Sequence, residues 1–184
     1  MKITDWLTAN TKTLEAADVP TARLDCLVLL EDLLGKNKAS ILAHMDVTLH
    51  SDQLSTLRTQ VEKRAKHVPL AFIRGHTEFY GREFIITENV LEPRPESETI
   101  IELLKKINKV TTIIDVGTGS GALAITATLE LPAISTHAVD IDPACLEVAQ
   151  RNSDKHKTSI VLHQGDLLDP ISNETLHEAV ILAN

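Results

Sequence analysis

A glycine-rich segment lies in the middle of the chain, directly after a short apolar run. It reads Asp115-Val-Gly-Thr-Gly-Ser-Gly, and an apolar helical pattern begins after it at Ala122. Glycine lets a backbone turn tightly and approach a ligand closely, and the N-terminus of a helix offers free N–H groups. The spacing Gly117-x-Gly119-x-x-Ala122 also satisfies the dinucleotide-binding fingerprint. The segment therefore predicts a nucleotide-binding loop, with a purely structural turn as the alternative.

Two carboxylates follow the next two apolar runs. Asp140 ends the first of these runs, where an acid reaches the two hydroxyls of a ribose, a group that both NAD and S-adenosylmethionine possess. Asp166 follows the second run and Gly165, and its carboxylate can accept a hydrogen bond from an adenine amino group. The N–H of Leu167 can then face a ring nitrogen, although a plain Gly-Asp turn is the alternative. Together these acids favour a nucleoside ligand without choosing between the two cofactors.

Strand and helix patterns alternate from residue 111 onward, as they do in an α/β fold. The expected strands cover residues 112–116, 136–140, 159–163 and 179–182, and the expected helices cover residues 122–131 and 143–152. Alternation at this spacing predicts a parallel sheet with crossover helices. Open sheets of this kind bind ligands at the carboxyl ends of their strands. The glycine-rich segment and both acids are therefore expected at one edge of the sheet.

The beginning of the chain has helical periodicity without strands. A first helix buries apolar residues on one face, and Thr4 or Asp5 is expected to cap its start. A second apolar stripe, between Leu24 and Leu34, stops at Gly35, a suitable C-cap. These two patterns predict two packed helices.

Two further helices complete the expected helical module. A short one fits residues 38–45, and a longer one begins with Ser51 as its expected cap. The exposed face of the longer helix is expected to carry four basic residues, namely Arg58, Lys63, Arg64 and Lys66. We therefore predict a small all-α bundle over residues 1–68.

The segment after Pro69 changes character. Residues 78–86 read as a β-hairpin with Gly81 at its turn, so residues 69–92 are expected to form a linker. Residues 91–96 are then expected to open a helix whose apolar residues lie between Ile100 and Ile107. Residues 93–184 are the expected cofactor-binding part.

Composition limits the classes of function. The 184 residues carry a formal net charge of -8, which argues against binding to a nucleic-acid backbone. Cys26 and Cys145 sit in apolar helical patterns and are expected to be buried free thiols. No HExxH or paired CxxC motif predicts a metal. With neither a signal peptide nor a bilayer-length apolar run in the sequence, a cytoplasmic location away from membranes is expected.

Three segments that precede the glycine-rich segment carry a more specific signal than that segment alone. They are the runs Pro69-Leu-Ala-Phe-Ile-Arg-Gly, Glu78-Phe-Tyr-Gly and Val90-Leu-Glu-Pro-Arg-Pro-Glu-Ser-Glu. With the glycine-rich segment and the two later acids, the chain resembles the HemK/PrmC family, the protein-(glutamine-N5) methyltransferases that act on peptide chain release factors. The resemblance implies a class I S-adenosylmethionine-dependent methyltransferase fold, with a Rossmann-like parallel sheet that is incomplete here. A helical substrate-docking bundle and a β-hairpin linker precede that sheet.

The same resemblance implies a role for each motif. S-adenosyl-L-methionine is the implied cofactor, and a glutamine in the Gly-Gly-Gln motif of peptide chain release factors is the implied target. Asp140 and Ile141 would hold the ribose side of the cofactor, and Asp166 with Leu167 the adenine. The loop with Gly117, Thr118, Gly119 and Gly121 would hold the methionine part, and Asp115 would orient this loop from behind. Arg94 and Pro95 would close over the pocket, with a proline-stiffened helix start as the alternative for this dipeptide.

Asn184 ends the chain and would be both a catalytic and a cofactor-pocket residue by the same resemblance. In the family this strand runs into Asn-Pro-Pro-Tyr, of which only the first residue is present, so a C-terminal truncation is expected. An amide oxygen and a backbone carbonyl can accept the two N–H bonds of a glutamine amide and orient its nitrogen. The chain alone is therefore expected to be inactive.

Other functions remain as alternatives. The acceptors of an Asn-Pro-Pro-Tyr motif also suit the exocyclic amine of adenine, so an adenine-N6 DNA methyltransferase is one alternative. Such an enzyme would have to flip the adenine out of the duplex, and the acidic net charge of this chain disfavours DNA binding. A nicotinamide-dependent dehydrogenase fits the glycine-rich segment but not the linker. An inactive fragment that binds only cofactor or partner is the non-enzyme alternative.

Overall fold

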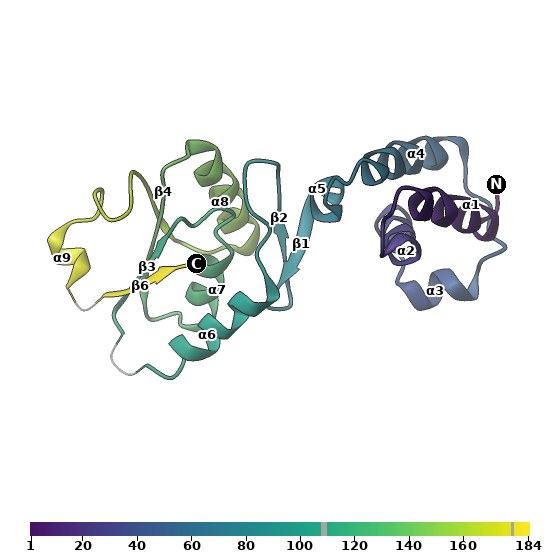
Figure 1. The fold of residues 1–184 in the computed structure, drawn as a ribbon. Coiled ribbons are helices and arrows are strands. Elements are labelled where there is room, and N and C mark those ends of the chain that lie inside the picture. The colour runs from purple at the N-terminus through teal and green to yellow at the C-terminus, as the bar shows by residue number, and fades with distance from the viewer. Residues whose placement is uncertain (108–109, 178) are drawn as a thin grey trace. The chain divides into compact units, whose positions relative to one another are not determined.

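The computed structural model of the chain describes residues 1–107, 110–177 and 179–184 (Figure 1). It contains two compact units, Met1–Arg74 and Gly75–Asn184, and each is described by itself.

The first unit is an all-α bundle that extends to Arg74, whereas the sequence pattern predicts a bundle that ends at residue 68 and a linker after it. Its helices are α1 (Ile3–Ala16), α2 (Ala22–Leu34), α3 (Lys38–Ala43), α4 (Ser51–Ala65) and α5 (Leu70–Arg74). Helices α1, α2 and α4 bury one common core, to which Trp6, Leu14, Leu30 and Leu57 contribute. Burial of these side chains stabilises a unit whose helices are individually too short to persist in water.

The ends of these helices only partly follow the sequence prediction. Gly35 ends α2 in the left-handed conformation, at φ 60°, as predicted. Neither Thr4 nor Asp5 caps α1: the Ile3 and Thr4 N–H groups instead donate to the carbonyls of Val47 and Met45. The first N–H groups of α1 are thus satisfied by a neighbouring backbone segment, which local sequence does not reveal.

The start of α4 also differs from the prediction. His50, and not Ser51, is the N-cap residue, and its N–H donates to the side-chain oxygen of Gln53 at 2.9 Å. A glutamine at the third position of a helix often closes its start in this way.

Arg64 corrects the prediction of a fully exposed basic face on α4. Its Nε donates to Asp25 Oδ2 at 2.6 Å, and the two side chains are only 16% and 5% exposed. Arg74 of α5 binds Asp32 in the same manner, at 2.6 Å. Asp25 and Asp32 lie seven residues apart and therefore share a face of α2. Two arginines thus fasten the last part of the unit to α2, while Arg58 stays exposed.

The second unit combines a hairpin with a four-stranded sheet. Strands β1 (His76–Phe79) and β2 (Arg82–Ile85) pair antiparallel, as predicted, and Phe79 lies opposite Arg82. The sheet has the order β5-β4-β3-β6 and all its neighbours are parallel. Its strands are β3 (Thr112–Val116), β4 (Ser135–Asp140), β5 (Val161–Gln164) and β6 (Ala179–Ala183). This confirms the Rossmann-like α/β class.

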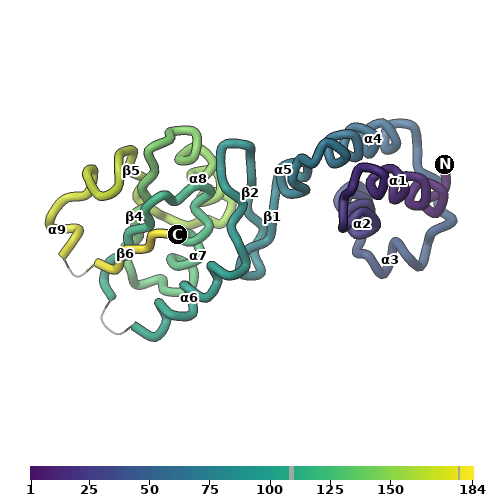
Figure 2. The backbone as a smooth tube through the Cα atoms, viewed as in Figure 1, coloured from purple at the N-terminus to yellow at the C-terminus, as the bar shows by residue number. Residues whose placement is uncertain are grey.

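The helices of this unit lie between the strands in sequence. They are the 3₁₀ helix η1 (Pro95–Ser97), α6 (Glu98–Leu104), α7 (Ala122–Glu130), α8 (Pro143–His156) and α9 (Asn173–Leu176). Helix α8 is four residues longer than predicted, and α9 was not predicted. The chain from β5 through α9 to β6 runs from one edge of the sheet to the other (Figure 2).

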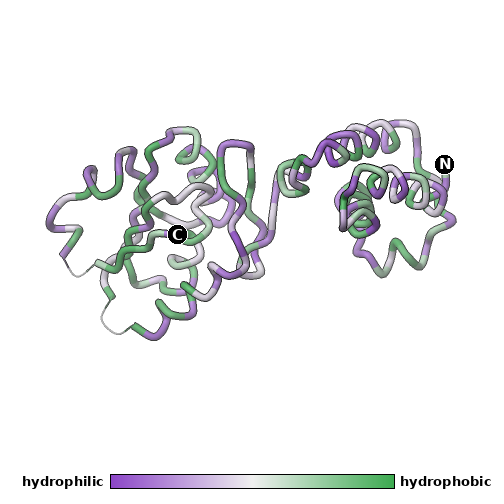
Figure 3. Tube along the Cα trace, in the orientation of Figure 1, coloured by the Kyte–Doolittle hydropathy of each residue, from purple (hydrophilic) through white to green (hydrophobic). Residues whose placement is uncertain are grey.

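Both faces of the sheet carry apolar side chains. On one face Ile113 and Leu182 join a buried cluster with Ile125 of α7 and with Phe79 and Phe84 of the hairpin. On the other face, Ile114 and Val139 contact Ile171, which precedes α9. Successive strand residues point to opposite faces, so a strand buried on both sides is apolar throughout. Strand β6, with the sequence Ala-Val-Ile-Leu-Ala, is also apolar and green in Figure 3, although it is an edge strand in which only Leu182 is buried.

The buried ion pair between Arg64 and Asp25 gives a testable prediction for the first unit. Replacing Arg64 with Ala leaves the Asp25 carboxylate buried without its partner, so the free energy of unfolding should fall by about 3 kcal/mol. The matched control is Arg58→Ala, because Arg58 pairs with Glu62 from a side chain that is 81% exposed. The control should change the free energy by about 0.5 kcal/mol or less. Urea unfolding followed by circular dichroism measures both, and equal effects would contradict the assignment.

Candidate functional site

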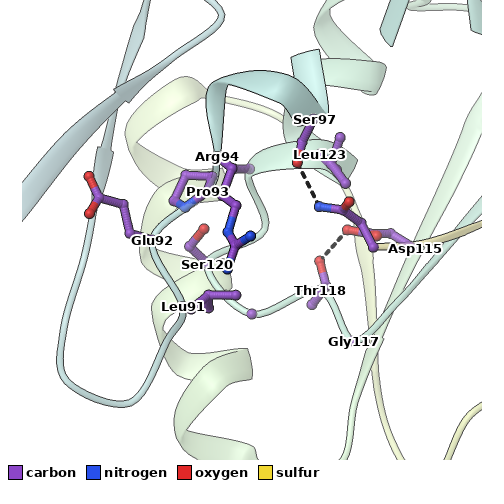
Figure 4. A pocket seen from close by; sticks show the side chains of 13 residues that line it. Leu91, Glu92, Pro93, Arg94, Ser97, Asp115, Gly117, Thr118, Ser120 and Leu123 are labelled. Carbon is purple, nitrogen blue, oxygen red and sulfur yellow. Dashed lines mark hydrogen bonds between the residues drawn. The ribbon is translucent and has the colours of Figure 1, made fainter. Parts of the chain in front are cut away.

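The carboxyl ends of the parallel strands enclose two adjoining cavities. The first, of about 340 Å³, lies between the glycine-rich segment and residues 91–97 (Figure 4). The second, of about 400 Å³, lies beside the ends of β4 and β5. Gly117 and Asn184 line both cavities. An elongated ligand that fills both would therefore pass these two residues.

Two carboxylates hold the glycine-rich segment in place. The Thr118 hydroxyl donates to Asp115 Oδ2 at 2.7 Å, a contact drawn in Figure 4. The Gly119 N–H donates to Asp140 Oδ2 at 2.9 Å. The N–H groups of Gly117 and Thr118 both donate to the carbonyl of Val139, at 2.9 and 3.0 Å. The loop is thus fixed by the ends of the two strands that flank it in sequence.

Two glycines of this loop have different reasons to be glycine. Gly119 has φ 53°, and nothing lies within 4 Å of where a Cβ would stand, so its outer side is open to a ligand. Gly121 has φ 77°, and a Cβ there would lie 3.3 Å from Ala149 Cα and 3.0 Å from Ile125 Cδ1. Gly121 therefore allows α8 to pack against the start of α7.

Asp115 is buried, and its carboxyl is a weaker acid than that of an ordinary aspartate. Burial raises the pKa of its carboxyl from 3.8 to about 6. Hydrogen bonds from Thr118 and from the backbone of Ala124 act in the opposite direction and lower the pKa, while the nearby charge of Asp140 raises it. Asp115 therefore titrates about two pH units above an ordinary aspartate.

The second cavity combines carboxylates with two exposed apolar side chains. Asp140 and Asp166 line it, and so do Ile141 and Leu167, which are 67% and 66% exposed. Leu167 has φ 46°, in the left-handed region that non-glycine residues seldom occupy. Polar groups beside apolar side chains suit a planar heterocycle with hydroxyl and amino groups, because its faces are apolar and its edges are polar.

Of the two residues expected to close over the pocket, Arg94 and Pro95, only Arg94 lines a cavity. Arg94 lines the first cavity, together with Leu91 and Pro93. Pro95 is the first residue of η1, and it is not among the residues that line either cavity. Its fixed φ suits the start of a helix, a position in which proline is common.

Asn184 reaches a partner that the sequence did not suggest. Its Nδ2 donates to the hydroxyl oxygen of Ser97 at 2.7 Å, and both residues line the first cavity. Ser97 is buried at the end of η1, next to Glu98, whose carboxylate accepts from the Tyr80 N–H at 2.8 Å. The hairpin turn thus fixes the element that meets Asn184. Ser97 lies 87 residues from Asn184, so only its place beside Pro93-Arg94-Pro95 could have drawn attention to it.

Three further features concern metal ligands, membrane-spanning helices and the two cysteines. Within the ranges that the structure describes, no group of three or more His, Cys, Asp or Glu side chains could hold a metal ion. None of the helices in those ranges has the length and apolar character needed to span a bilayer. Cys26 and Cys145 are buried and free, as predicted.

Comparison with known proteins decides the family. Residues 5–75 match the PrmC N-terminal domain, and residues 97–184 match the ribosomal protein L11 methyltransferase (PrmA) family. The release factor glutamine methyltransferase of Bacillus subtilis is 38% identical over 165 residues, which cover 86% of this chain and 57% of that protein. The chain belongs to the family of release factor glutamine methyltransferases. The family member from Geobacter sulfurreducens is 32% identical over 174 residues, or 94% of this chain and 60% of that protein.

The chain spans less than two thirds of these family members, at 57% and 60% of their length. Among solved structures, a ribosomal protein L11 methylase from Lactobacillus delbrueckii subsp. bulgaricus aligns with 30% identity and a TM-score of 0.38. The alignment covers 43% of this chain and 42% of that one.

The raised pKa of Asp115 predicts a pH-dependent stability. A carboxyl whose pKa rises on folding stabilises the folded state below its unfolded pKa, and this contribution is lost as the pH rises through the folded value. A rise from 3.8 to about 6 corresponds to about 3 kcal/mol. Relative to Asp115→Asn, the wild-type chain should therefore lose about 2.5 kcal/mol of unfolding free energy between pH 4 and pH 7.5, because part of the effect already falls below pH 4. Urea unfolding across this range measures the difference, and a constant difference would mean that Asp115 keeps an ordinary pKa.

Proposed function

We propose that this chain is the cofactor-binding and substrate-docking part of an enzyme that methylates peptide chain release factors. In this reaction a methyl group passes from S-adenosylmethionine to the side-chain amide of the glutamine in the Gly-Gly-Gln motif. One observation carries the proposal: the relatives that bear this name match across both units, and the PrmC N-terminal domain matches residues 5–75. A methyltransferase of another specificity would share the second unit but not the first.

The two cavities fit the proposed cofactor. The open side of the loop at Gly117 and Gly119 accommodates the methionine part, which Arg94 can contact from the opposite wall of the first cavity. Asp140 accepts from the ribose hydroxyls, since each carboxylate oxygen keeps a lone pair beyond those used by Gly119 and Asp142.

The adenine side of the fit rests on the second cavity. Asp166 accepts from the exocyclic amino group, and the Leu167 N–H faces a ring nitrogen. The side chains of Ile141 and Leu167 cover the apolar faces of the ring, and this removes their exposed apolar surface from water.

Asn184 is placed for work on an amide. When bound, the cofactor supplies an electrophilic methyl group on a positively charged sulfur. A glutamine amide nitrogen is a weak nucleophile because its lone pair is conjugated with the carbonyl. The Asn184 amide donates to Ser97, which leaves its Oδ1 to accept an N–H of the target and to stabilise the positive charge that develops on the nitrogen. By resemblance to Asn-Pro-Pro-Tyr, a backbone carbonyl after Asn184 accepts the second N–H.

The helical unit and the charge of the chain fit a protein target better than DNA. The formal net charge of -8 disfavours a phosphate backbone, and the first unit matches a domain named for this family. We therefore assign docking of the release factor to residues 1–74, which form the first unit.

Mass spectrometry of the product tests the reaction. Because the chain spans 57% of the Bacillus subtilis relative, it should be joined to the segment that follows the matched region in that protein. With S-adenosylmethionine and a release factor, the joined protein should add one methyl group to the Gly-Gly-Gln glutamine. Asn184→Ala should lower the rate by a factor of about 100 or more, the scale of losing one aligned polar group at the reacting centre. A methyl group on any other residue, or only on DNA adenine, would overturn the proposal.

The ribose contact can be tested separately on the chain itself. Asp140→Ala should weaken binding of S-adenosylhomocysteine by about 1.5 to 3 kcal/mol, the scale of hydrogen bonds to a charged group. Asp142→Ala is the matched control, because Asp142 is a neighbouring carboxylate whose Oδ1 caps α8 at Ala144 N and which lines neither cavity. Calorimetric titration should give nearly wild-type affinity for the control. Equal affinities for the two variants would mean that the ribose lies elsewhere.

A further inference from the structure

Asn152 of α8 joins the hairpin to the glycine-rich segment. Its Oδ1 accepts from the Ile85 N–H at 2.7 Å, and its Nδ2 donates to the Ile85 carbonyl at 3.0 Å. The same Nδ2 donates to the Ser120 carbonyl at 2.9 Å. Ile85 ends β2, and Ser120 lies between Gly119 and Gly121 and lines the first cavity. One side chain thus bridges two backbone segments that are 35 positions apart.

The chemistry of the bridge allows only one orientation of the amide. Both donors of the Asn152 NH₂ group face carbonyls, and its oxygen faces an N–H, so the opposite orientation would set like groups against each other. The side chain is 0% exposed, so water cannot replace a missing partner. An aspartate would present a second acceptor to two carbonyls, and an apolar side chain would leave three backbone groups without partners.

The bridge also completes the edge of the hairpin. The Ile86 N–H donates to the Gly75 carbonyl within the hairpin, whereas the Ile85 N–H turns outward to Asn152. Alternate N–H groups of an antiparallel strand face opposite edges, and an outward one needs a partner when it is buried. Helix α8 and β2 lie side by side in Figures 1 and 2. Lys155 and His156 of α8 hold Glu83 of the same strand, at 2.6 and 3.0 Å.

We infer that Asn152 is a positioning residue that couples binding in the first cavity to the order of the β1–β2 hairpin. A ligand on the glycine-rich segment favours the backbone that points the Ser120 carbonyl at Asn152, and the same amide holds Ile85. Opening of the hairpin edge therefore releases the loop and weakens ligand binding. By reciprocity, the ligand opposes opening of the hairpin by the same factor. The inference rests on the proposed cofactor as the ligand.

Ser153 provides a matched control on the same helix. It is 2% exposed, and its hydroxyl donates to the Thr158 carbonyl at 2.9 Å, so its hydrogen bonds stay at the C-terminal end of α8. Ser153→Ala and Asn152→Ala both remove a buried polar group from α8, and both should lower stability. Only Asn152→Ala removes the hydrogen bonds that join the hairpin to the glycine-rich segment.

Hydrogen exchange and calorimetry with S-adenosylhomocysteine test the coupling. When the hairpin edge opens, the buried Ser120 carbonyl loses its partner, which should weaken ligand binding about tenfold. By reciprocity, saturating ligand should slow exchange of the Ile86 amide in the wild-type chain about tenfold. Asn152→Ala should bind the ligand about tenfold more weakly, and saturating ligand should no longer slow Ile86 exchange. The amides of β4 should still be slowed in that variant. Ser153→Ala should match the wild type in both measurements.

Several outcomes would overturn the inference and each is distinct. Ligand that slows the β4 amides of the wild-type chain but not Ile86 excludes the coupling, and this result needs no variant. Wild-type affinity in Asn152→Ala also excludes it. If that variant does not fold, Asn152→Ser replaces it, since a hydroxyl is too short to reach both segments. Absence of any binding to the wild-type chain overturns the proposed cofactor, and the inference with it.

Discussion

The site depends on two carboxylates that end neighbouring parallel strands and hold one loop. Asp115 accepts from Thr118, and Asp140 accepts from the Gly119 N–H, so the glycine-rich segment is fastened at two successive residues. Such a loop would otherwise be among the most mobile parts of the chain, because glycine loses more conformational entropy on folding than any other residue. The two acids stand close enough that the charge of Asp140 raises the pKa of Asp115. The fold thus accepts an electrostatic cost and keeps the glycine-rich segment ordered along the wall of the first cavity.

The rest of the second unit supports this arrangement from outside. Helix α8 packs so closely on the loop that Gly121 has no room for a side chain against Ala149. The same helix supplies Asn152, which binds both the loop and β2. On the other side of the pocket, the hairpin turn fixes Glu98 and so places Ser97 against Asn184. The hairpin, which the sequence pattern predicts to be part of a linker, belongs to the second unit and contributes to the positions of groups on both sides of the first cavity.

Features that depend on nearby residues were predictable from the sequence. Strand β3 matches its predicted bounds, and the parallel sheet follows from the alternation of strands and helices. Gly35 ends α2 as predicted, because a left-handed C-cap is a local requirement. The four-residue α9 was missed, since so short a helix has no periodicity to detect.

Features that depend on distant partners were not predictable. Arg64 looked like one basic residue among four on a helix face, yet its partner Asp25 lies 39 residues away. The cap of α1 comes from the backbone of residues 45–47. Ser97 and Asn152 carried no signal of their own, because a single sequence does not reveal that they meet Asn184 and Ile85 across 87 and 67 residues. The roles predicted for the cofactor-contacting residues stay predictions, although all of them except Pro95 and Gly121 line the two cavities.

Calorimetric titration of the chain with S-adenosylhomocysteine and, separately, with NAD tests the central claim most directly. Both ligands carry a ribose that Asp140 can bind, so the acid and the glycine-rich segment alone do not separate them. The account predicts that S-adenosylhomocysteine binds with one site per chain and that NAD gives no measurable heat under the same conditions. Tight binding of NAD with no response to S-adenosylhomocysteine would contradict it.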